Sequence, residues 1–135
     1  MTLATDLLAR LDRLNALHER IGSIALSVDA DRRQELVDAR RELAHCIGEI
    51  SQAADALLPT ICDAAAITEY RQHLGAMRSS AALHQASWPA ISMTADRAGY
   101  AASSGQVRDA HRAFDGWMRR TISGATGRSL MGESK

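Results

Sequence analysis

The feature that most constrains the fold is an apolar stripe in residues 32–57, where hydrophobic positions recur at alternating steps of three and four. Its members are Leu36, Ala39, Leu43, Cys46, Ile50, Ala53 and Leu57. This spacing places them on one face of an α-helix and is typical of helices that pack along one another at a shallow angle. A half-buried strand would instead alternate with a period of two. The stretch therefore predicts a helix that packs against another helix.

Three further segments carry the same helical period. Residues 5–28 have the stripe Leu7, Leu11, Leu14, His18, Ile21, Ala25 and Val28. The segment ending near residue 88 has Ile67, Tyr70, Leu74, Met77, Ala81, His84 and Trp88. The last segment has Val107, Ala110, Phe114, Trp117 and Thr121. Because alanine is abundant and the chain has only two prolines, its composition also favours helix over sheet.

The second helix is expected to end near Leu57, because Pro59 disfavours helical geometry in the residue before it. Thr60 and Asp63 have the spacing of a capping box and are expected to begin the third helix. Pro89 is expected to stop or kink that helix in its turn. Four amphipathic segments joined by short turns follow from these boundaries.

Ser103 and Gln106 resemble a second capping box, at which the fourth helix is expected to start if residues 90–103 form a short helix of their own; the alternative is that residues 90–103 are already the start of the fourth helix. The predicted fold is therefore all-α: an antiparallel up-down-up-down four-helix bundle, with a kink or short extra helix around residues 89–103. Residues 1–123 are expected to form one helical-bundle domain. Residues 124–135, which are glycine-rich and polar, are predicted to be a flexible tail.

The location expected from the sequence is the cytoplasm. Charges at Asp6, Arg10 and Asp12 interrupt the N-terminal apolar residues, unlike the apolar core of a signal peptide. No stretch approaches the roughly 18 apolar residues of a membrane span, so no membrane partner is expected. Cys46 lies within the second helix and Cys62 beyond its end, too far along the helix for a disulfide. Both thiols are predicted to be reduced.

Charge is distributed unevenly although the chain is neutral overall. Residues 1–69 carry twelve acidic side chains and seven arginines, whereas residues 70–135 carry four acidic side chains, eight arginines and Lys135. The favoured interpretation is that an acidic half packs beside a basic half of the same domain. The alternative is that each half presents a face to a partner of opposite charge.

Glu42 and His45 form a Glu-x-x-His pair, the motif that di-metal helical bundles carry on two helices. This chain has one copy, and His45 falls on the side of its helix away from the stripe residues Leu43 and Cys46. A ligand at that position would face solvent. The pattern therefore argues against a di-iron centre.

A different histidine site is left open. His18, His73 and His111 are expected at similar depth along the bundle, where three imidazoles can hold zinc or another divalent metal. The favoured expectation is that the protein has no cofactor. His18 and His84 are then core histidines hydrogen-bonded to their neighbours.

The segment AHCIGEISQAADAL, residues 44–57, resembles the active helix of histidine-phosphotransfer domains, which are also four-helix bundles. Those helices carry an exposed histidine followed by Lys-Gly three and four positions later. The resemblance implies that His45 is a phosphoacceptor. The sequence departs from the pattern where Gly48 and Glu49 replace that pair, and Glu49 would repel a phosphoryl group.

All aromatic residues lie in the second half of the chain: Tyr70, Trp88, Tyr100, Phe114 and Trp117. Their helical spacing favours a role in the core, so nucleic acid is not an expected partner. The alternative is an aromatic-lined binding patch.

From these patterns, the expected function is that of a non-enzymatic helical interaction or regulatory module, an adaptor or accessory protein. It would act through its helix faces on a protein partner or on a second copy of the chain. The alternative is a histidine-based site, either for a metal or cofactor or for phosphotransfer.

Overall fold

A computed structural model describes residues 2–25, 32–89 and 97–133, except for the side chains of residues 25, 97 and 126–133. It contains four α-helices: α1 (Leu3–Ala25), α2 (Arg33–Ile61), α3 (Ala64–Ser87) and α4 (Arg97–Glu133). No strand occurs in the described part of the chain. The all-α prediction is therefore confirmed.

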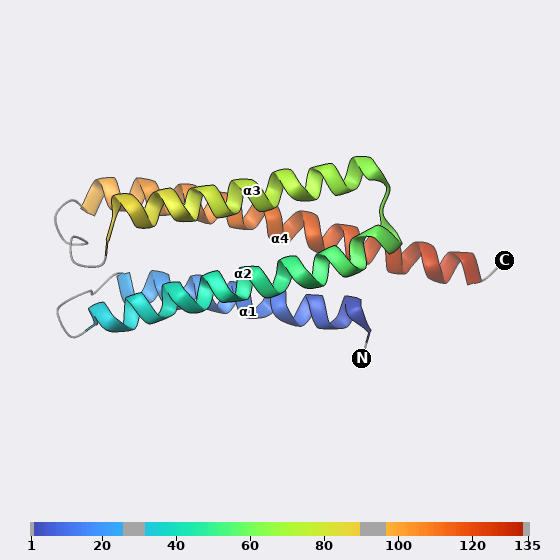
Figure 1. Ribbon diagram of the computed structural model, residues 1–135, viewed down its shortest axis with the longest axis horizontal. Helices are drawn as coiled ribbons and strands as arrows, with labels where there is room; N and C mark the ends of the chain where they lie inside the picture. The colour runs from blue at the N-terminus through green and yellow to red at the C-terminus, as the bar shows by residue number, and fades with distance from the viewer. Residues whose placement is uncertain (1, 26–31, 90–96, 134–135) are drawn as a thin grey trace.

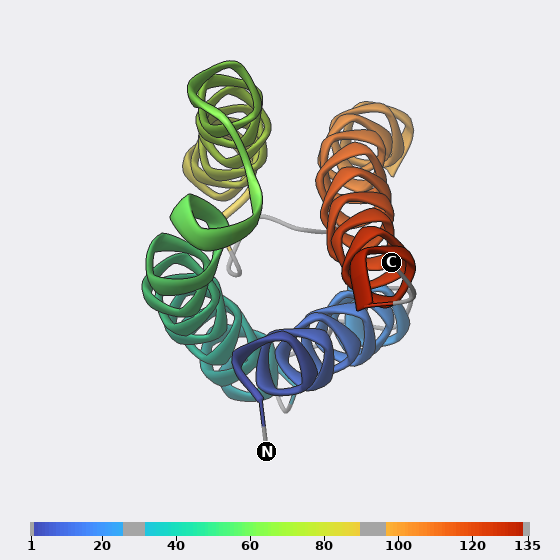
Figure 2. The ribbon, with the colours of Figure 1, turned by 90° about the vertical axis from the view of Figure 1, so that its right-hand side faces the viewer.

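The helices form two hairpins that lie side by side. Within each hairpin, α1 against α2 and α3 against α4, the helices run in opposite directions (Figure 1). Viewed along the axis, α3, α2, α1 and α4 follow one another around the molecule (Figure 2). Contacts within each hairpin are the most extensive, those between α1 and α4 are fewer, and those between the neighbouring helices α2 and α3 are fewer still. The α2–α3 seam is therefore the loosest side of the molecule.

The end of α2 differs from the sequence-based expectation, because the helix continues through Pro59 to Ile61. Proline removes one backbone hydrogen bond, but the following turn is closed by other donors. The Cys62 N–H donates to the Leu58 carbonyl at 2.8 Å, and the Thr60 hydroxyl donates to the carbonyl of the preceding turn at 2.6 Å. Leu58 is also fully buried, so packing stabilises the turn that proline weakens.

Helix α3 begins one turn later than Thr60 would have placed it. Asp63 is the N-cap, and its carboxylate accepts a hydrogen bond from the Ala66 N–H at 2.9 Å. At the other end, the Trp88 N–H donates to the His84 carbonyl at 2.8 Å, and the helix stops before Pro89 as expected. Asp63 rather than Thr60 therefore sets the start of α3.

Helix α4 begins at Arg97, so the prediction that Ser103 caps it is wrong. Ser103 lies inside the helix, and its hydroxyl contacts His84 Nδ1 at 2.7 Å across to α3. The predicted kink or extra helix is absent from residues 97–103, whereas residues 90–96 lie outside the described part, as do residues 26–28 of the first predicted helix. Helix α4 also continues past residue 123 to Glu133, beyond the ends of the other helices (Figure 1). The flexibility predicted for residues 124–135 stays a prediction.

The buried side chains form two separate apolar clusters. The larger joins leucines of α1 and α2 to the aromatic side of α3 and α4, and includes Leu7, Leu11, Leu14, Ile50, Tyr70, Met77, Phe114 and Met118. The smaller comprises Ile24, Leu36 and Ala39, with Ile21, Trp88 and Tyr100 packed against it. Polar side chains, among them His18, His84 and His111, lie in the interior between the two clusters.

An ion pair connects the acidic hairpin to the basic one. Arg119 of α4 reaches Asp12 of α1 at 2.7 Å and also binds Asp115 of its own helix at 3.0 Å. This contact agrees with the interpretation that the two halves pack on each other. Both cysteines are free thiols as predicted, Cys46 buried and Cys62 half-buried.

Among the described helices, none combines the length and the hydropathy that crossing a bilayer requires.

Candidate functional site

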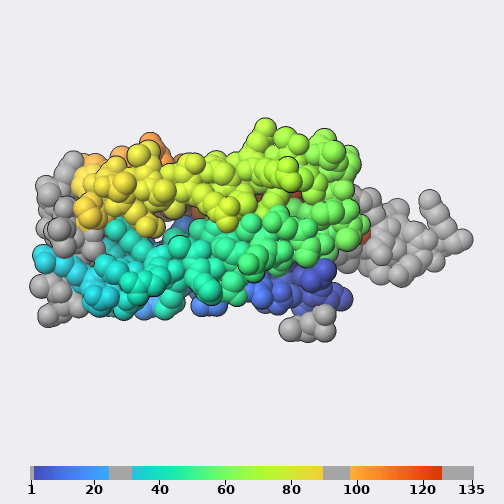
Figure 3. Space-filling view, in the orientation of Figure 1, coloured from blue at the N-terminus to red at the C-terminus, as the bar shows by residue number. Residues whose placement is uncertain are grey.

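A cavity of about 400 Å³ lies at the break between the two apolar clusters, and all four helices contribute to its lining. Its walls include Ile21 of α1, Leu43 of α2, Ala81 of α3 and Val107 of α4. Between α2 and the C-terminal half of α3 the molecular surface is hollowed (Figure 3), and the neighbouring pocket there shares Leu43, Ala81 and Gln85 with the lining of the cavity. Small-molecule sites in proteins commonly fall between about 300 and 1,000 Å³, so this volume is sufficient for a small organic ligand.

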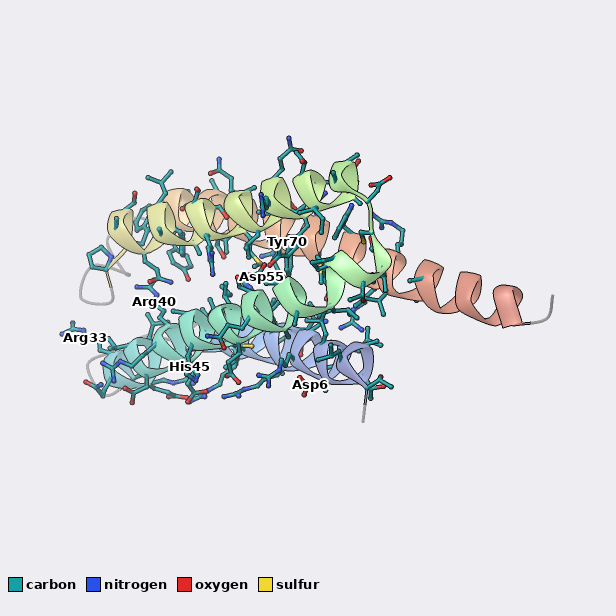
Figure 4. The ribbon with its side chains drawn as sticks, turned by 45° about the vertical axis from the view of Figure 1, so that its right-hand side comes forward. Asp6, Arg33, Arg40, His45, Asp55 and Tyr70 are labelled. Carbon is teal, nitrogen blue, oxygen red and sulfur yellow. The ribbon has the colours of Figure 1, made fainter. Side chains whose placement is uncertain are left out.

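The polar side chains of the cavity come from different helices. His18 lies on α1, Arg40 on α2, His84 on α3, and Tyr100 and His111 on α4. Figure 4 shows Arg40 directed from α2 into the space facing α3. Three imidazoles, a phenol and a guanidinium therefore line one cavity in the interior, where a helical bundle ordinarily has apolar side chains.

His18 and His111 are in direct contact. Their ring centroids are 3.9 Å apart and the rings are stacked at 25°. Burial, together with the neighbouring His111, lowers the pKa of His18 to about 3. Burial is also the main cause that lowers the pKa of His111. Both rings are therefore neutral near pH 7, which allows them to stack without charge repulsion.

Each ring of this pair has a buried nitrogen atom that finds no hydrogen-bond partner in the described part of the chain, Nε2 in His18 and Nδ1 in His111. The other nitrogen of His111, Nε2, lies 2.7 Å from Asn15 Oδ1. An unpartnered buried polar group costs about 1–3 kcal/mol. The pair is therefore an energetic liability to the protein alone, and it lies in the wall of a cavity.

The third histidine, His84, is held in a fixed orientation. Its Nδ1 contacts the Ser103 hydroxyl at 2.7 Å, and its ring lies 5.0 Å from that of Tyr100. Burial and the positive charge of Arg40 lower the pKa of His84. Burial likewise lowers the pKa of Arg40 and raises that of Tyr100. These shifts share one cause, which is the poor hydration of this part of the interior.

Of the three histidines predicted to form a zinc site, only His18 and His111 are in contact, through their stacked rings. The ring of His73 instead lies 5.9 Å from that of Trp117. In the described ranges, no group of three or more histidine, cysteine, aspartate or glutamate side chains is arranged to hold a metal ion. The zinc alternative stays a prediction.

His45 lies outside this cavity. Its side chain is 75% exposed, as the sequence predicted, and Nε2 lies 3.4 Å from Glu49 Oε1. Glu49 also pairs with Arg10 and Arg13 of α1. The Glu49 carboxylate therefore lies beside the His45 imidazole, where the sequence analysis expected it to repel a phosphoryl group. Phosphorylation of His45 stays a prediction.

The five aromatic residues separate into two groups. Tyr70, Phe114 and Trp117 pack together in the larger apolar cluster, with Tyr70 6.3 Å from each of the other two ring centroids. Trp88 and Tyr100 form an edge-to-face pair at 5.8 Å beside the smaller cluster. Of the five, Tyr100 alone contributes to the large cavity. Tyr70 instead borders a second hollow on the α2–α3 seam, facing Asp55 (Figure 4).

Sequence reasoning missed Asn15 and Arg40, which occupy positions beside the apolar stripes rather than on them. The available signal was His18, a polar residue on an otherwise apolar stripe. It indicated a polar break in the core but not the identity of the groups from other helices that share it.

Comparison with protein-family models, with curated proteins and with solved structures finds no match, so the site must be interpreted from its own geometry.

Proposed function

We propose that this protein is a non-enzymatic regulatory module that binds a small molecule in the cavity between its helices. The observation that carries the proposal is a cavity of about 400 Å³ whose lining includes His18 and His111, each of which has a buried nitrogen atom that lacks a hydrogen-bond partner among the described residues. A ligand that supplies the missing hydrogen bonds removes an energetic cost that the protein otherwise bears.

The proposal includes the antiparallel up-down-up-down bundle expected from the sequence. In support, the Arg119–Asp12 ion pair joins the two hairpins at 2.7 Å, and the Trp117 indole N–H donates to Glu69 at 2.9 Å within the α3–α4 hairpin. A ligand between the hairpins would add contacts between α2 and α3, which have fewer contacts with each other than α1 and α4 have. A ligand that binds only when the two hairpins are packed together stabilises that packed state, so ligand binding would hold the hairpins more firmly against each other.

Binding without catalysis fits the chemistry of the cavity better than hydrolysis does. The close Ser103–His84 pair is the arrangement nearest to a catalytic one. However, Ser103 lies inside α4, where backbone N–H groups bond within the helix and cannot stabilise an oxyanion. The charge of Arg40 also lowers the pKa of His84, which makes this histidine a weaker base.

A protein partner or a second copy of the chain remains part of the proposal, as the effector of the ligand-bound form. Leu83, which is 65% exposed on α3, is a candidate contact for such a partner.

Substituting Gly22 tests the binding proposal, because this residue contributes to the cavity and an added Cβ atom there meets nothing within 4 Å. Gly22 is exposed at the rim of the cavity, so in Gly22→Leu the new side chain would obstruct the entrance. Gly75→Leu is the matched control: its Cβ atom is equally unobstructed, and Gly75 lies on α3 outside the cavity lining. Both changes replace a helical glycine and should raise stability by a similar amount, about 0.5–1 kcal/mol.

The measurement is a set of amide correlation spectra recorded during titration with neutral, cationic and anionic aromatic fragments: benzyl alcohol, benzylamine, benzoate and hydroxybenzoate. We expect at least one fragment to shift cavity amides on all four helices in a saturable way. That response should be lost in Gly22→Leu and kept in Gly75→Leu. No saturable response to any fragment, or an unchanged response in Gly22→Leu, would contradict the proposed function.

A further inference from the structure

The charges around the cavity are predominantly positive. Among the described residues, Arg40, Arg108 and Arg112 contribute to its lining, against a single carboxylate, Glu19. Arg40 is half-buried, whereas Arg108, Arg112 and Glu19 are exposed at the rim. A guanidinium is always charged and presents several N–H donors, so it favours oxyanions. The cavity therefore attracts a negatively charged group and disfavours a cationic one.

The hydrogen bond to Asn15 defines which nitrogen of His111 carries the proton. Asn15 Oδ1 can only accept, so His111 Nε2 donates to it across 2.7 Å. A neutral imidazole has one proton, and Nδ1 therefore has a free lone pair. This atom is buried and unpartnered, in a side chain that is only 5% exposed. A ligand atom that satisfies it must be a hydrogen-bond donor.

The remaining walls are apolar. Ile21, Leu43 and Val107 contribute aliphatic surface, and Tyr100 contributes an aromatic ring. Such walls favour a ligand body of carbon atoms over a bare inorganic ion. The stacked His18 ring adds a flat surface beside the His111 ring.

We propose that the cavity binds a small organic oxyanion that also carries a hydroxyl group. The oxyanion lies against Arg40, and the carbon body fills the space between the aliphatic walls. The hydroxyl reaches the buried Nδ1 of His111 after a local shift of the cavity wall, and donates a hydrogen bond to it. This inference rests on the proposed ligand-binding function and adds the chemical class of the ligand to it.

The test compares matched ligands on the unmodified protein: 3- and 4-hydroxybenzoate, benzoate, and the methyl esters of both hydroxybenzoates. Benzoate lacks the donor and the esters lack the charge. We expect one of the hydroxybenzoates to bind most tightly, with benzoate and its own ester each at least about 10-fold weaker, since a hydrogen bond to a charged or buried partner contributes about that factor. Dissociation constants come from amide titrations that follow the cavity residues.

Two variants check the roles of the individual side chains. In Arg40→Met the hydroxybenzoate should bind about 10-fold more weakly while its ester is unaffected. Arg33→Met, at the exposed start of the same helix (Figure 4), should change neither. In His111→Phe the preference for hydroxybenzoate over benzoate should disappear. The ligand comparison needs no variant, so it decides the matter even if a variant fails to fold.

The outcomes separate this inference from the proposed function. If the esters, the neutral fragments or benzoate bind in the cavity as tightly as the hydroxybenzoates, the assigned ligand class is wrong. The binding function stands in that case. If only the cationic fragment binds, the assigned class is likewise wrong. If no fragment of any charge binds at these amides, both proposals fail together.

Discussion

Acidification from pH 7 to pH 5 is expected to destabilise the fold through His18. Its pKa is lowered from 6.5 to about 3 by burial and by the neighbouring His111. Between these two values the unfolded chain binds a proton that the folded chain does not. Stability therefore rises with pH across this window and is lost as pH falls through it.

The magnitude follows from proton binding to the unfolded chain, which lowers its free energy by RT ln(1 + 10^(6.5 − pH)). This quantity is about 0.2 kcal/mol at pH 7 and about 2.1 kcal/mol at pH 5, whereas the folded state gains almost nothing in this range. His18 should therefore contribute a loss of about 2 kcal/mol. Burial lowers the pKa of His84 and His111 as well, so both add to the loss in the same direction.

The assay is urea unfolding followed by circular dichroism at pH 7 and pH 5, on the unmodified chain and on His18→Gln. The variant removes the titrating ring, so its loss of unfolding free energy between the two pH values should be smaller by about 2 kcal/mol. His45→Gln, which replaces an exposed imidazole remote from the His18–His111 pair, is the control and should retain the full loss. An equal loss in His18→Gln and the unmodified chain would refute the reasoning.

Three further substitutions test the packing. Phe114→Ala removes a fully buried ring from the larger apolar cluster and should lower the unfolding free energy by about 3–5 kcal/mol in urea titrations; a loss below about 1 kcal/mol would be inconsistent with that burial. Asp63→Ala removes the N-cap bond of α3 and should cost about 1 kcal/mol, with Asp63→Asn retaining most of the stability as the control. Leu83→Ser, at an exposed site, should change stability by no more than about 0.5 kcal/mol, and a larger loss would indicate that Leu83 is buried in solution.

The helical elements were predictable because they depend on local spacing. Steps of three and four between apolar residues define a helical face whatever that face contacts. The same spacing predicted the burial of His84 and the exposure of His45, since each prediction needs only the direction of one side chain from its own helix.

Helix ends were harder to predict, because packing can override a local signal. Proline usually ends a helix, yet α2 passes through Pro59 because Leu58 is anchored in the core. Ser103 has the spacing of a cap, but its hydroxyl bonds to His84 on another helix.

The sequence by itself determined that this chain folds into helices, where most of them run, and that His18 and His84 each interrupt an apolar stripe. Only the tertiary structure decided that His18 stacks on His111, 93 positions later, and that Arg40 from a third helix shares their cavity. The physical reason is that a helical period fixes the angular position of a side chain about its own axis. The height at which two helices meet depends instead on packing along their whole length. The turn positions indicated a similar depth for His18, His73 and His111, but they could not show that only His18 and His111 would stack.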